Sequence, residues 1–322
     1  MMAGLRGGLL PRGPVIRHEI IRHDTAAHRA HSSGPDLVAG PASARARMAI
    51  GAIASCIVLL TQTNCKPGGN KNPAPSATVE APRDPRFDAE MIPSLEAPHF
   101  SKVETGGVVL DGILDEPIWK KAARTGPFVD VGSGKVRRDL PVTSEARVFY
   151  DDDFLYVAFE VQDATIHGGF PTDALDPHLW ERDTVEIMLD PEGDGDNKDY
   201  YEIQVNPQNL VFDSHFDDYN LPRGGPSGPF GHEDWKSGLS SGVKLNGSLD
   251  DDSDRDNSYF VEAKIPWRSF RQTASGPPMG KTWRVNFYAM KDNGGVGWSP
   301  ILGQGNFHKA SRFGRLRFAG ND

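Results

Sequence analysis

From about Val108 onward, apolar side chains recur at every second position in a series of short segments. This alternation predicts half-buried β-strands. Turn clusters rich in Asp, Gly, Pro and Asn separate the segments, and the best helical candidates, Glu116–Ala123 and Trp267–Arg271, are short. Many short strands joined by polar turns predict an all-β fold, an antiparallel β-sandwich. The predicted apolar faces are Leu155, Val157, Phe159, Val161, then Val185, Ile187, Leu189, then Tyr201, Ile203, Val205, then Tyr259, Val261, Ala263, Ile265, and finally Trp283, Val285, Phe287, Ala289.

The same alternation places polar side chains on the second face of the predicted strands. Glu186 and Gln204 point away from the apolar sets of their own segments. A later segment directs Arg284, Asn286 and Tyr288 away from its apolar set in the same way. If these strands share a sheet, its second face is polar with aromatic side chains, because successive side chains alternate between faces. Such a face suits a hydroxyl-rich ligand.

The first ninety residues lack this alternation and carry one apolar run, Met48–Leu60. The run is shorter than the roughly 20 residues that a membrane span needs, and Arg45 and Arg47 precede it, so it predicts an export signal. The segment after it is rich in Pro, Gly and Asn and has too little apolar surface to offset its ordering entropy. The predicted organisation is 1–47, a disordered extension or a stretch translated from a mistaken upstream start; 48–65, the export signal; 66–90, a flexible linker; and 91–319, the folded domain.

Two cysteines lie in or just after the apolar run and compete as a lipidation point. Cys56 follows the small residues that a lipoprotein signal peptidase prefers, whereas Cys65 follows a full-length apolar region. We favour Cys65, which predicts an exported lipoprotein anchored in the outer membrane or at the cell surface. A plain secretory signal or a short anchor is the alternative.

The chain carries a net charge of −9, yet the residues before Met48 contain seven arginines and only three acidic side chains. The predicted domain is therefore more acidic than the whole chain, and an acidic domain is a poor partner for nucleic acid. The domain contains no cysteine. This composition excludes a disulfide framework, a cysteine zinc site and a cysteine nucleophile within it.

An ordered set of motifs in the predicted domain resembles the family 9 carbohydrate-binding modules. Single motifs are weakly specific, but their order covers nearly all of the domain. The resemblance implies an immunoglobulin-like or jelly-roll-like sandwich that binds an oligo- or polysaccharide and has no enzymatic activity. The motifs are Leu110–Trp119, Val148–Asp151, Phe154–Val157, Leu179–Pro191, Tyr200–Asn206, Val261–Trp267 and Arg312–Phe318.

The resemblance also implies a sugar site between two aromatic side chains. Trp180 stands at the position of the first tryptophan and Phe307 at that of the second, while Glu186 matches a glutamate that bonds sugar hydroxyls. Gln204 and Gln304 stand where the family has an arginine and an asparagine. His308 follows Phe307 and offers a further hydrogen-bond donor. The alternatives are that Trp180 is a half-buried residue at a strand start and that Phe307 packs against the sandwich edge; Trp119, Trp267 and Trp283 are assigned to the core.

Family members carry structural calcium, and two acidic turns offer oxygen ligands for it. The first turn has Asp190, Asp194, Asp196 and Asp199, although its spacing only half matches an EF-hand loop. The second is Asp250–Asp256. The alternative for each turn is a solvated loop without an ion. Calcium is expected for the domain without an assigned ligand set, and the first turn is the preferred candidate.

Two other functions compete with sugar binding. A glycoside hydrolase would use two carboxylates, and acidic residues are plentiful, but no catalytic motif stands out. A b-type haem in a sheet-end pocket is the other alternative, with Met188, Met290 or His308 as axial ligands.

Overall fold

The structure of the protein is a computed structural model that describes residues 92–222 and 227–320. The extension at 1–47, the export signal at 48–65, Cys56, Cys65 and the linker at 66–90 lie outside the described residues. The helical segments are α1 (Lys102–Thr105) and the 3-10 turns η2 (Pro117–Lys120), η3 (Leu179–Glu181), η5 (Trp267–Ser269), η6 (Arg271–Thr273) and η7 (Ala310–Arg312). Among the described residues, no helix has the length and apolar character needed to cross a membrane.

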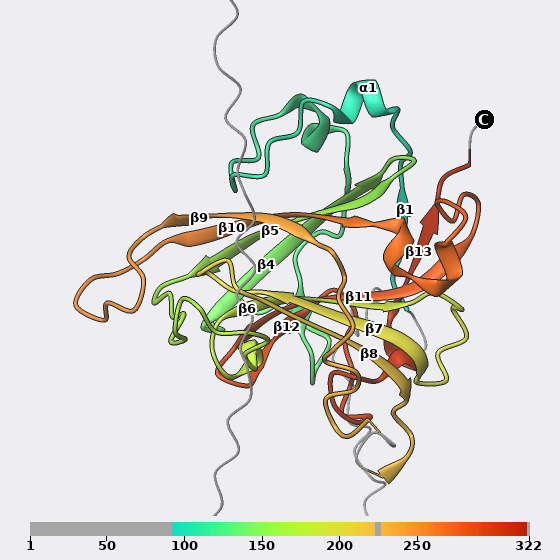
Figure 1. Ribbon diagram of the computed structural model, residues 1–322. Helices are drawn as coiled ribbons and strands as arrows, with labels where there is room; N and C mark the ends of the chain where they lie inside the picture. The colour runs from blue at the N-terminus through green and yellow to red at the C-terminus, as the bar shows by residue number, and fades with distance from the viewer. Residues whose placement is uncertain (1–91, 223–226, 321–322) are drawn as a thin grey trace, which may run out of the picture. The chain divides into compact units, whose positions relative to one another are not determined.

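In the described part of the chain, thirteen strands form two sheets that lie face to face (Figure 1). The larger has eight strands, with the order β1-β13-β11-β6-β7-β8 and with β12 and β3 continuing from β11. The smaller has the order β2-β4-β5-β10-β9. All pairings are antiparallel except that of β1 with β13, which is parallel. The strands are β1 (Ser94–Ala97), β2 (Ala123–Arg124), β3 (Val129–Asp130), β4 (Val142–Tyr150), β5 (Phe154–Asp163), β6 (Thr184–Asp190), β7 (Lys198–Val205), β8 (Val211–Asp218), β9 (Ser240–Asn246), β10 (Ser258–Pro266), β11 (Thr282–Lys291), β12 (Gly294–Gly297) and β13 (Gly314–Phe318).

The main core lies between the sheets and consists of the apolar faces that the alternation predicted. Val185, Ile187 and Leu189 of β6 face Val157, Phe159 and Val161 of β5 across the interior within one continuous cluster of buried side chains. Burial of such side chains stabilises the fold by about 25 cal/mol per Å² of apolar surface removed from water. The predicted antiparallel β-sandwich is confirmed, and so is the assignment of Trp119, Trp267 and Trp283 to buried packing.

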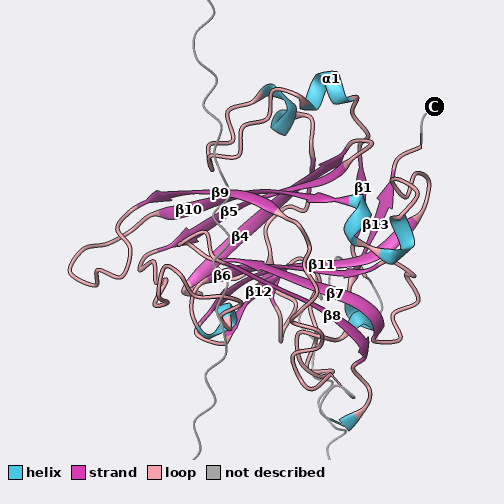
Figure 2. Ribbon diagram, viewed as in Figure 1, coloured by secondary structure: helices cyan, strands magenta, loops and turns pink. Residues whose placement is uncertain are grey.

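The outer faces of both sheets are covered as well. On the five-stranded sheet, Trp119 of η2 packs edge-on against Phe149, in a cluster with Ile118 and Tyr156. Figure 1 shows the segment with α1 above this sheet. Figure 2 shows loops on the side of the eight-stranded sheet that faces away from the five-stranded sheet. Phe230 of the β8–β9 connection and Phe307 of the β12–β13 connection line a pocket there. The polar second face predicted from the sequence is therefore enclosed, because Glu186 and Gln204 are almost fully buried.

Candidate functional site

A pocket of about 300 Å³ opens on the covered outer face of the eight-stranded sheet. Its size is at the lower end of the range for small-ligand sites, roughly 300–1,000 Å³. Its walls are mostly aromatic, and its polar groups are few. The lining side chains are Trp180, Glu186, Glu202, Phe212, Phe216, Tyr219, Pro229, Phe230, Met290, Asn293, Asn306, Phe307 and His308.

Even-numbered residues of four neighbouring strands form the floor of this aromatic pocket. Glu186 of β6 and Glu202 of β7 lie beside Phe212 and Phe216 of β8, and Met290 of β11 completes the floor. The neighbouring odd-numbered side chains of these strands point to the opposite face of the sheet, because alternate side chains of a strand point to opposite faces. The strand register alone thus brings these five side chains to one surface.

One wall of the pocket is built around Trp180, which η3 presents just before β6. The Trp180 indole stacks on the His178 ring at 4.4 Å between centroids, with an interplanar angle of 18°. Phe212 meets the indole edge-on at 5.1 Å, and Phe230 lies at 5.6 Å. The Trp180 carbonyl accepts a hydrogen bond from the Asn293 backbone amide at 3.0 Å. These contacts fix the orientation of the indole while leaving the residue only partly buried.

The other wall comes from the loop before β13. The Phe307 ring packs edge-on against Tyr288 at 5.0 Å, and the Tyr288 hydroxyl donates a hydrogen bond to the Phe307 carbonyl at 3.1 Å. His308 stacks on Tyr219 at 4.3 Å between ring centroids. The Nδ1 atom of His308 lies 2.8 Å from the Tyr200 hydroxyl. Burial lowers the pKa of His308 to about 4, so its imidazole is neutral at neutral pH.

Two buried glutamates on the floor are joined by one amide. The Nε2 group of Gln204 donates to Glu202 Oε1 at 2.6 Å and to Glu186 Oε1 at 3.0 Å. Burial, together with the charge of Glu202, raises the pKa of Glu186 well above its ordinary value, and burial raises that of Glu202 to about 7. The second oxygen of Glu186, Oε2, is buried without a hydrogen-bond partner among the described residues. Burial and the neighbouring Glu202 thus favour the protonated form of the Glu186 carboxyl, and its Oε2 is available to a ligand.

Most of the residues predicted for the sugar site come together in this pocket. Trp180, Glu186, Phe307 and His308 all line it. Gln204 lies directly behind, where it bridges the two glutamates. Gln304 is exposed and is not among the lining residues.

Sequence reasoning missed Glu202 and the aromatic residues of the β8 region. Phe212 and Phe216 alternate along β8, but the residues between them are Asp, Ser and His, so the segment does not show the apolar set of a half-buried strand. Tyr219 and Phe230 belong to a connection without a regular pattern. Asn306, whose Nδ2 donates to the Tyr219 hydroxyl at 2.9 Å, stands next to Phe307 and carried no separate signal.

The four aspartates predicted as calcium ligands have partners within and beside their own turn. The two oxygens of Asp190 accept hydrogen bonds from the Gly193 and Gly195 amides, both at 2.9 Å. Asp194 accepts from the Asp196 amide, and Asp199 lies beside Arg271 at 3.6 Å. These contacts give the carboxylates protein partners within the turn, and among the described residues the four aspartates are not a group whose ligand atoms converge. Calcium binding by the domain stays a prediction.

The ammonium group of Lys291, at the end of β11, is surrounded by oxygen atoms. The Nζ atom of Lys291 lies 2.9 Å from Asp163 Oδ2, 2.6 Å from the Thr165 carbonyl oxygen and 3.1 Å from both Asp183 oxygens. Burial alone would lower the pKa of Lys291, but the hydrogen bond to Asp163 and the charge of Asp183 outweigh it and raise the pKa. The ammonium group thus stays charged inside a cage of oxygen atoms.

Residues 110–321 match the family described as carbohydrate family 9 binding domain-like. The chain belongs to this family. The exoglucanase XynX of Acetivibrio thermocellus shares 27% identity with the family 9 domain over 219 residues, which are 67% of this chain and 17% of that protein. The endo-1,4-beta-xylanase A of Thermotoga maritima shares 27% identity over 225 residues, which are 69% of this chain and 18% of that protein. The matches thus span less than a fifth of either relative.

A solved structure supports the fold of the family 9 domain. A proposed carbohydrate-binding protein from Bacteroides uniformis ATCC 8492 superposes with a TM-score of 0.52 at 21% identity. The superposition covers 70% of this chain and 99% of that one. The family predicted from the ordered motifs is confirmed, and so is its sandwich architecture.

Proposed function

We propose that the domain binds carbohydrate without catalysis, with one or two sugar units held in the aromatic pocket. The observation that carries the proposal is the combination, in one pocket of a family 9 domain, of a Trp180 wall, a Phe307 wall and buried carboxyl groups between them. Aromatic faces favour the apolar C–H face of a pyranose by dispersion, while a few polar groups fix its hydroxyls. The names of the relatives, an exoglucanase and a xylanase, point to plant-type β-glycans as the first ligands to try.

Glu186, His308 and Gln204 have distinct roles in this proposal. The Glu186 carboxyl group uses Oε2, which lacks a protein partner, to exchange hydrogen bonds with a sugar hydroxyl. The proposal assigns the proton of the neutral His308 to Nε2, so that Nδ1 accepts from the Tyr200 hydroxyl 2.8 Å away and Nε2, which lies 3.9 Å from Glu202 Oε2, donates to a sugar oxygen. Gln204 keeps Glu186 and Glu202 in place and does not contact the sugar. A site with two stacking surfaces and so few hydrogen bonds corresponds to a Kd of roughly micromolar to millimolar.

The test is a glycan array followed by titration calorimetry on the best ligand. Trp180→Ala should reduce the affinity at least about tenfold, a loss of about 1.4 kcal/mol or more, because the stacking surface is removed. Phe307→Ala should reduce it less, since Phe307 is already packed on Tyr288. Trp235→Ala is the matched control, because Trp235 is also a partly buried tryptophan but lies outside the aromatic pocket. Equal affinity for Trp180→Ala and the unmodified chain, or release of shortened sugars, would refute the proposal.

We propose further that the chain is exported and held at a membrane by a lipid on Cys65, with the family 9 domain on a flexible tether. The support is the apolar run before Cys65 and the Pro- and Gly-rich segment after it. Cys65→Ala should abolish incorporation of a labelled fatty acid in cells, while Cys56→Ala should leave it unchanged. The reverse result would move the lipid to Cys56, and labelling of both variants at the unmodified level would reject a lipid anchor on either cysteine.

A further inference from the structure

Two histidines and one aspartate lie close together at the edge strand β8 and offer ligand atoms for a metal ion. One nitrogen or oxygen from each of His215, Asp217 and His232 lies within 4.8 Å of the others. His215 and Asp217 are two positions apart on β8 and share one face. His232 pairs with His215 across the strand edge, where its amide donates to the His215 carbonyl at 2.8 Å. The backbone therefore holds the three side chains together.

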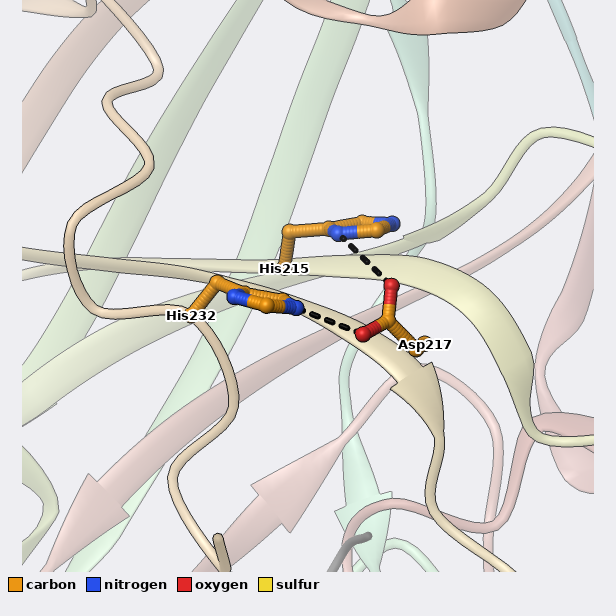
Figure 3. A group of neighbouring side chains, drawn as sticks. All are labelled: His215, Asp217 and His232. Atoms are coloured by element: carbon orange, nitrogen blue, oxygen red, sulfur yellow. Dashed lines mark hydrogen bonds and ion pairs between the residues drawn. The ribbon is translucent and has the colours of Figure 1, made fainter. Parts of the chain in front are cut away.

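The ligand atoms of the three side chains converge. His232 Nε2 lies 2.5 Å from Asp217 Oδ2, and His215 Nδ1 lies 3.8 Å from Asp217 Oδ1. The two imidazole rings are stacked with an interplanar angle of 16° and a centroid distance of 5.8 Å. Figure 3 shows both rings with one nitrogen directed at the Asp217 carboxylate between them. Two imidazoles and one carboxylate are ligands that zinc and its neighbours in the transition series prefer.

Both histidines also have a carboxylate behind the ring. The Nε2 atom of His215 lies 3.7 Å from Asp199 Oδ1, and the Nδ1 atom of His232 lies 3.8 Å from Asp234 Oδ1. Histidines that bind a metal usually donate their other ring N–H to such a group, which fixes the tautomer. His215 is 3% exposed, and its Nε2 has no hydrogen-bond partner among the described residues. A metal ion on Nδ1 would place the proton on Nε2, opposite the Asp199 carboxylate.

The surroundings supply charge and access for a cation. The carboxylates of Asp199, Asp217 and Asp234 surround the two rings, and Arg271 is the cation that approaches them, at 3.6 Å from Asp199 and 3.9 Å from Asp217. The Arg271 side chain is 66% exposed, so it can turn toward solvent when an ion enters. A surface pocket of about 270 Å³, lined in part by His215, His232 and Arg271, gives the ion a route from solvent.

We infer that His215, Asp217 and His232 form a three-ligand site for a divalent transition-metal ion of the zinc class, with water in the remaining coordination positions. The site is separate from the aromatic pocket, because Phe212 and Phe216 point to the opposite face of β8. It is nevertheless connected to the pocket through the backbone. His232 is two residues from Phe230, so a bound ion ties the segment that carries this pocket wall to β8.

The test compares Zn²⁺ binding by the full chain and by variants, using titration calorimetry and thermal unfolding. The chain also has cysteines and histidines before residue 66 that can bind zinc, so the loss of one equivalent on substitution is the decisive quantity. His232→Gln should lose one equivalent of Zn²⁺, or bind it at least tenfold more weakly. Its thermal midpoint should no longer rise by several degrees with Zn²⁺, since an ion that binds only the folded state stabilises that state.

His167→Gln is the matched control, because His167 also contacts one aspartate, Asp252, at 2.8 Å, but without a second histidine in the group. It should bind Zn²⁺ as the unmodified chain does. If His232→Gln does not fold by circular dichroism, Asp217→Asn takes its place, since that carboxylate is 46% exposed. A folded His232→Gln or Asp217→Asn variant with unchanged stoichiometry and affinity overturns the inference, whatever the result of the sugar-binding test.

Discussion

Lys291 joins the ends of three chain segments through one buried ammonium group. Asp163 ends β5 in the smaller sheet, Asp183 directly precedes β6 in the larger one, and Lys291 ends β11. The side chains of the two aspartates are 1% and 0% exposed, and burial together with the charge of Asp163 raises the pKa of Asp183 to about 7, so their ionised forms depend on the ammonium as a partner. A buried charge without its partner is strongly unfavourable, whereas the complete cluster is tolerated. The sequence contained no sign of this cluster, because its members are 20 to more than 100 residues apart.

Lys291→Met should therefore destabilise the domain by about 3–5 kcal/mol, the usual effect of removing one member of a buried ion pair. The measurement is the free energy of unfolding in urea at neutral pH. Lys120→Met is the matched control, since Lys120 is exposed on η2 and its replacement should change the free energy by less than about 0.5 kcal/mol. An equally small effect at Lys291 would show that the cluster is solvated in solution.

At the scale of elements, the Leu110–Trp119 segment is hydrogen-bonded to the outer face of the five-stranded sheet. Glu262 of β10 accepts hydrogen bonds from the Asp111 and Gly112 amides at 3.1 and 2.8 Å. The indole N–H of Trp119 donates to the other oxygen of Glu262 at 2.6 Å. Gly112 has φ = +78°, and a Cβ atom there would lie 2.3 Å from the Lys244 backbone nitrogen of β9. The motif thus holds a loop and two strands together.

Gly112→Ala should cost at least about 2 kcal/mol of stability, because the side chain is strained at positive φ and collides with the β9 backbone. Chemical unfolding should show a lower midpoint with an unchanged slope. Gly107→Ala is the control in the same segment, since a Cβ there meets nothing within 4 Å and φ is not positive. If both variants unfold at the same denaturant concentration, the close packing of Gly112 on β9 does not contribute to stability.

The elements that the sequence predicted well are those with one apolar and one polar face. In β5, β6, β7, β10 and β11, the alternation identified both the strand and the side that faces the core. β8 was missed because its core-facing positions are Asp213, His215 and Asp217, while its outward positions include Phe212 and Phe216. The predicted helical segments proved to be 3-10 turns, η2, η5 and η6, which hold too few residues for a helical period.

Only those residues of the candidate site that align with the family motifs could be predicted from the sequence. Trp180, Glu186 and Phe307 were found by position, and the structure places them in one pocket. The pairing of Glu186 with Glu202 depends on strand register, which the local pattern does not determine. The raised pKa of Glu186 could not be predicted for the same reason, since it comes from burial and from the neighbouring Glu202.

At the scale of the whole domain, several acidic groups are buried in a way that links stability to pH. Burial raises the pKa of Glu202 and of Glu262 to about 7, and the pKa of Glu186 is raised well above its ordinary value. Between the unfolded pKa near 4.5 and the folded values, the folded state holds protons that the unfolded state has released. Stability therefore falls as the pH rises through this window. His308 acts in the opposite sense, but only between about pH 4 and its ordinary value near 6.5.

The thermal midpoint should accordingly fall between pH 6.5 and 8, with a loss of free energy on the order of 1–2 kcal/mol at about 1.4 kcal/mol per pKa unit. Glu202→Gln removes one of these titrations and the smaller of the two causes of the raised pKa of Glu186, the charge of Glu202, so it should make the fall smaller. Glu192→Gln, at an exposed position of the β6–β7 turn, is the control. A midpoint that rises over this pH range in the unmodified protein would contradict the account.

The parallel pairing of β1 with β13 decides how the domain responds to mechanical load. β1 is an edge strand of four residues, paired from Ser94↔Arg315 to Ala97↔Phe318. The chain then continues to β4 of the other sheet, where the Phe100 amide donates to the Tyr150 carbonyl and the Tyr150 amide donates to the Pro98 carbonyl. A force that reaches Ser94 from the preceding chain acts along β1 and in the direction that slides it past β13. Sliding strains the hydrogen bonds of the strand together, whereas peeling would break them one after another. A load applied through Ser94 therefore acts on β1 in shear, across the four pairs of one short parallel strand.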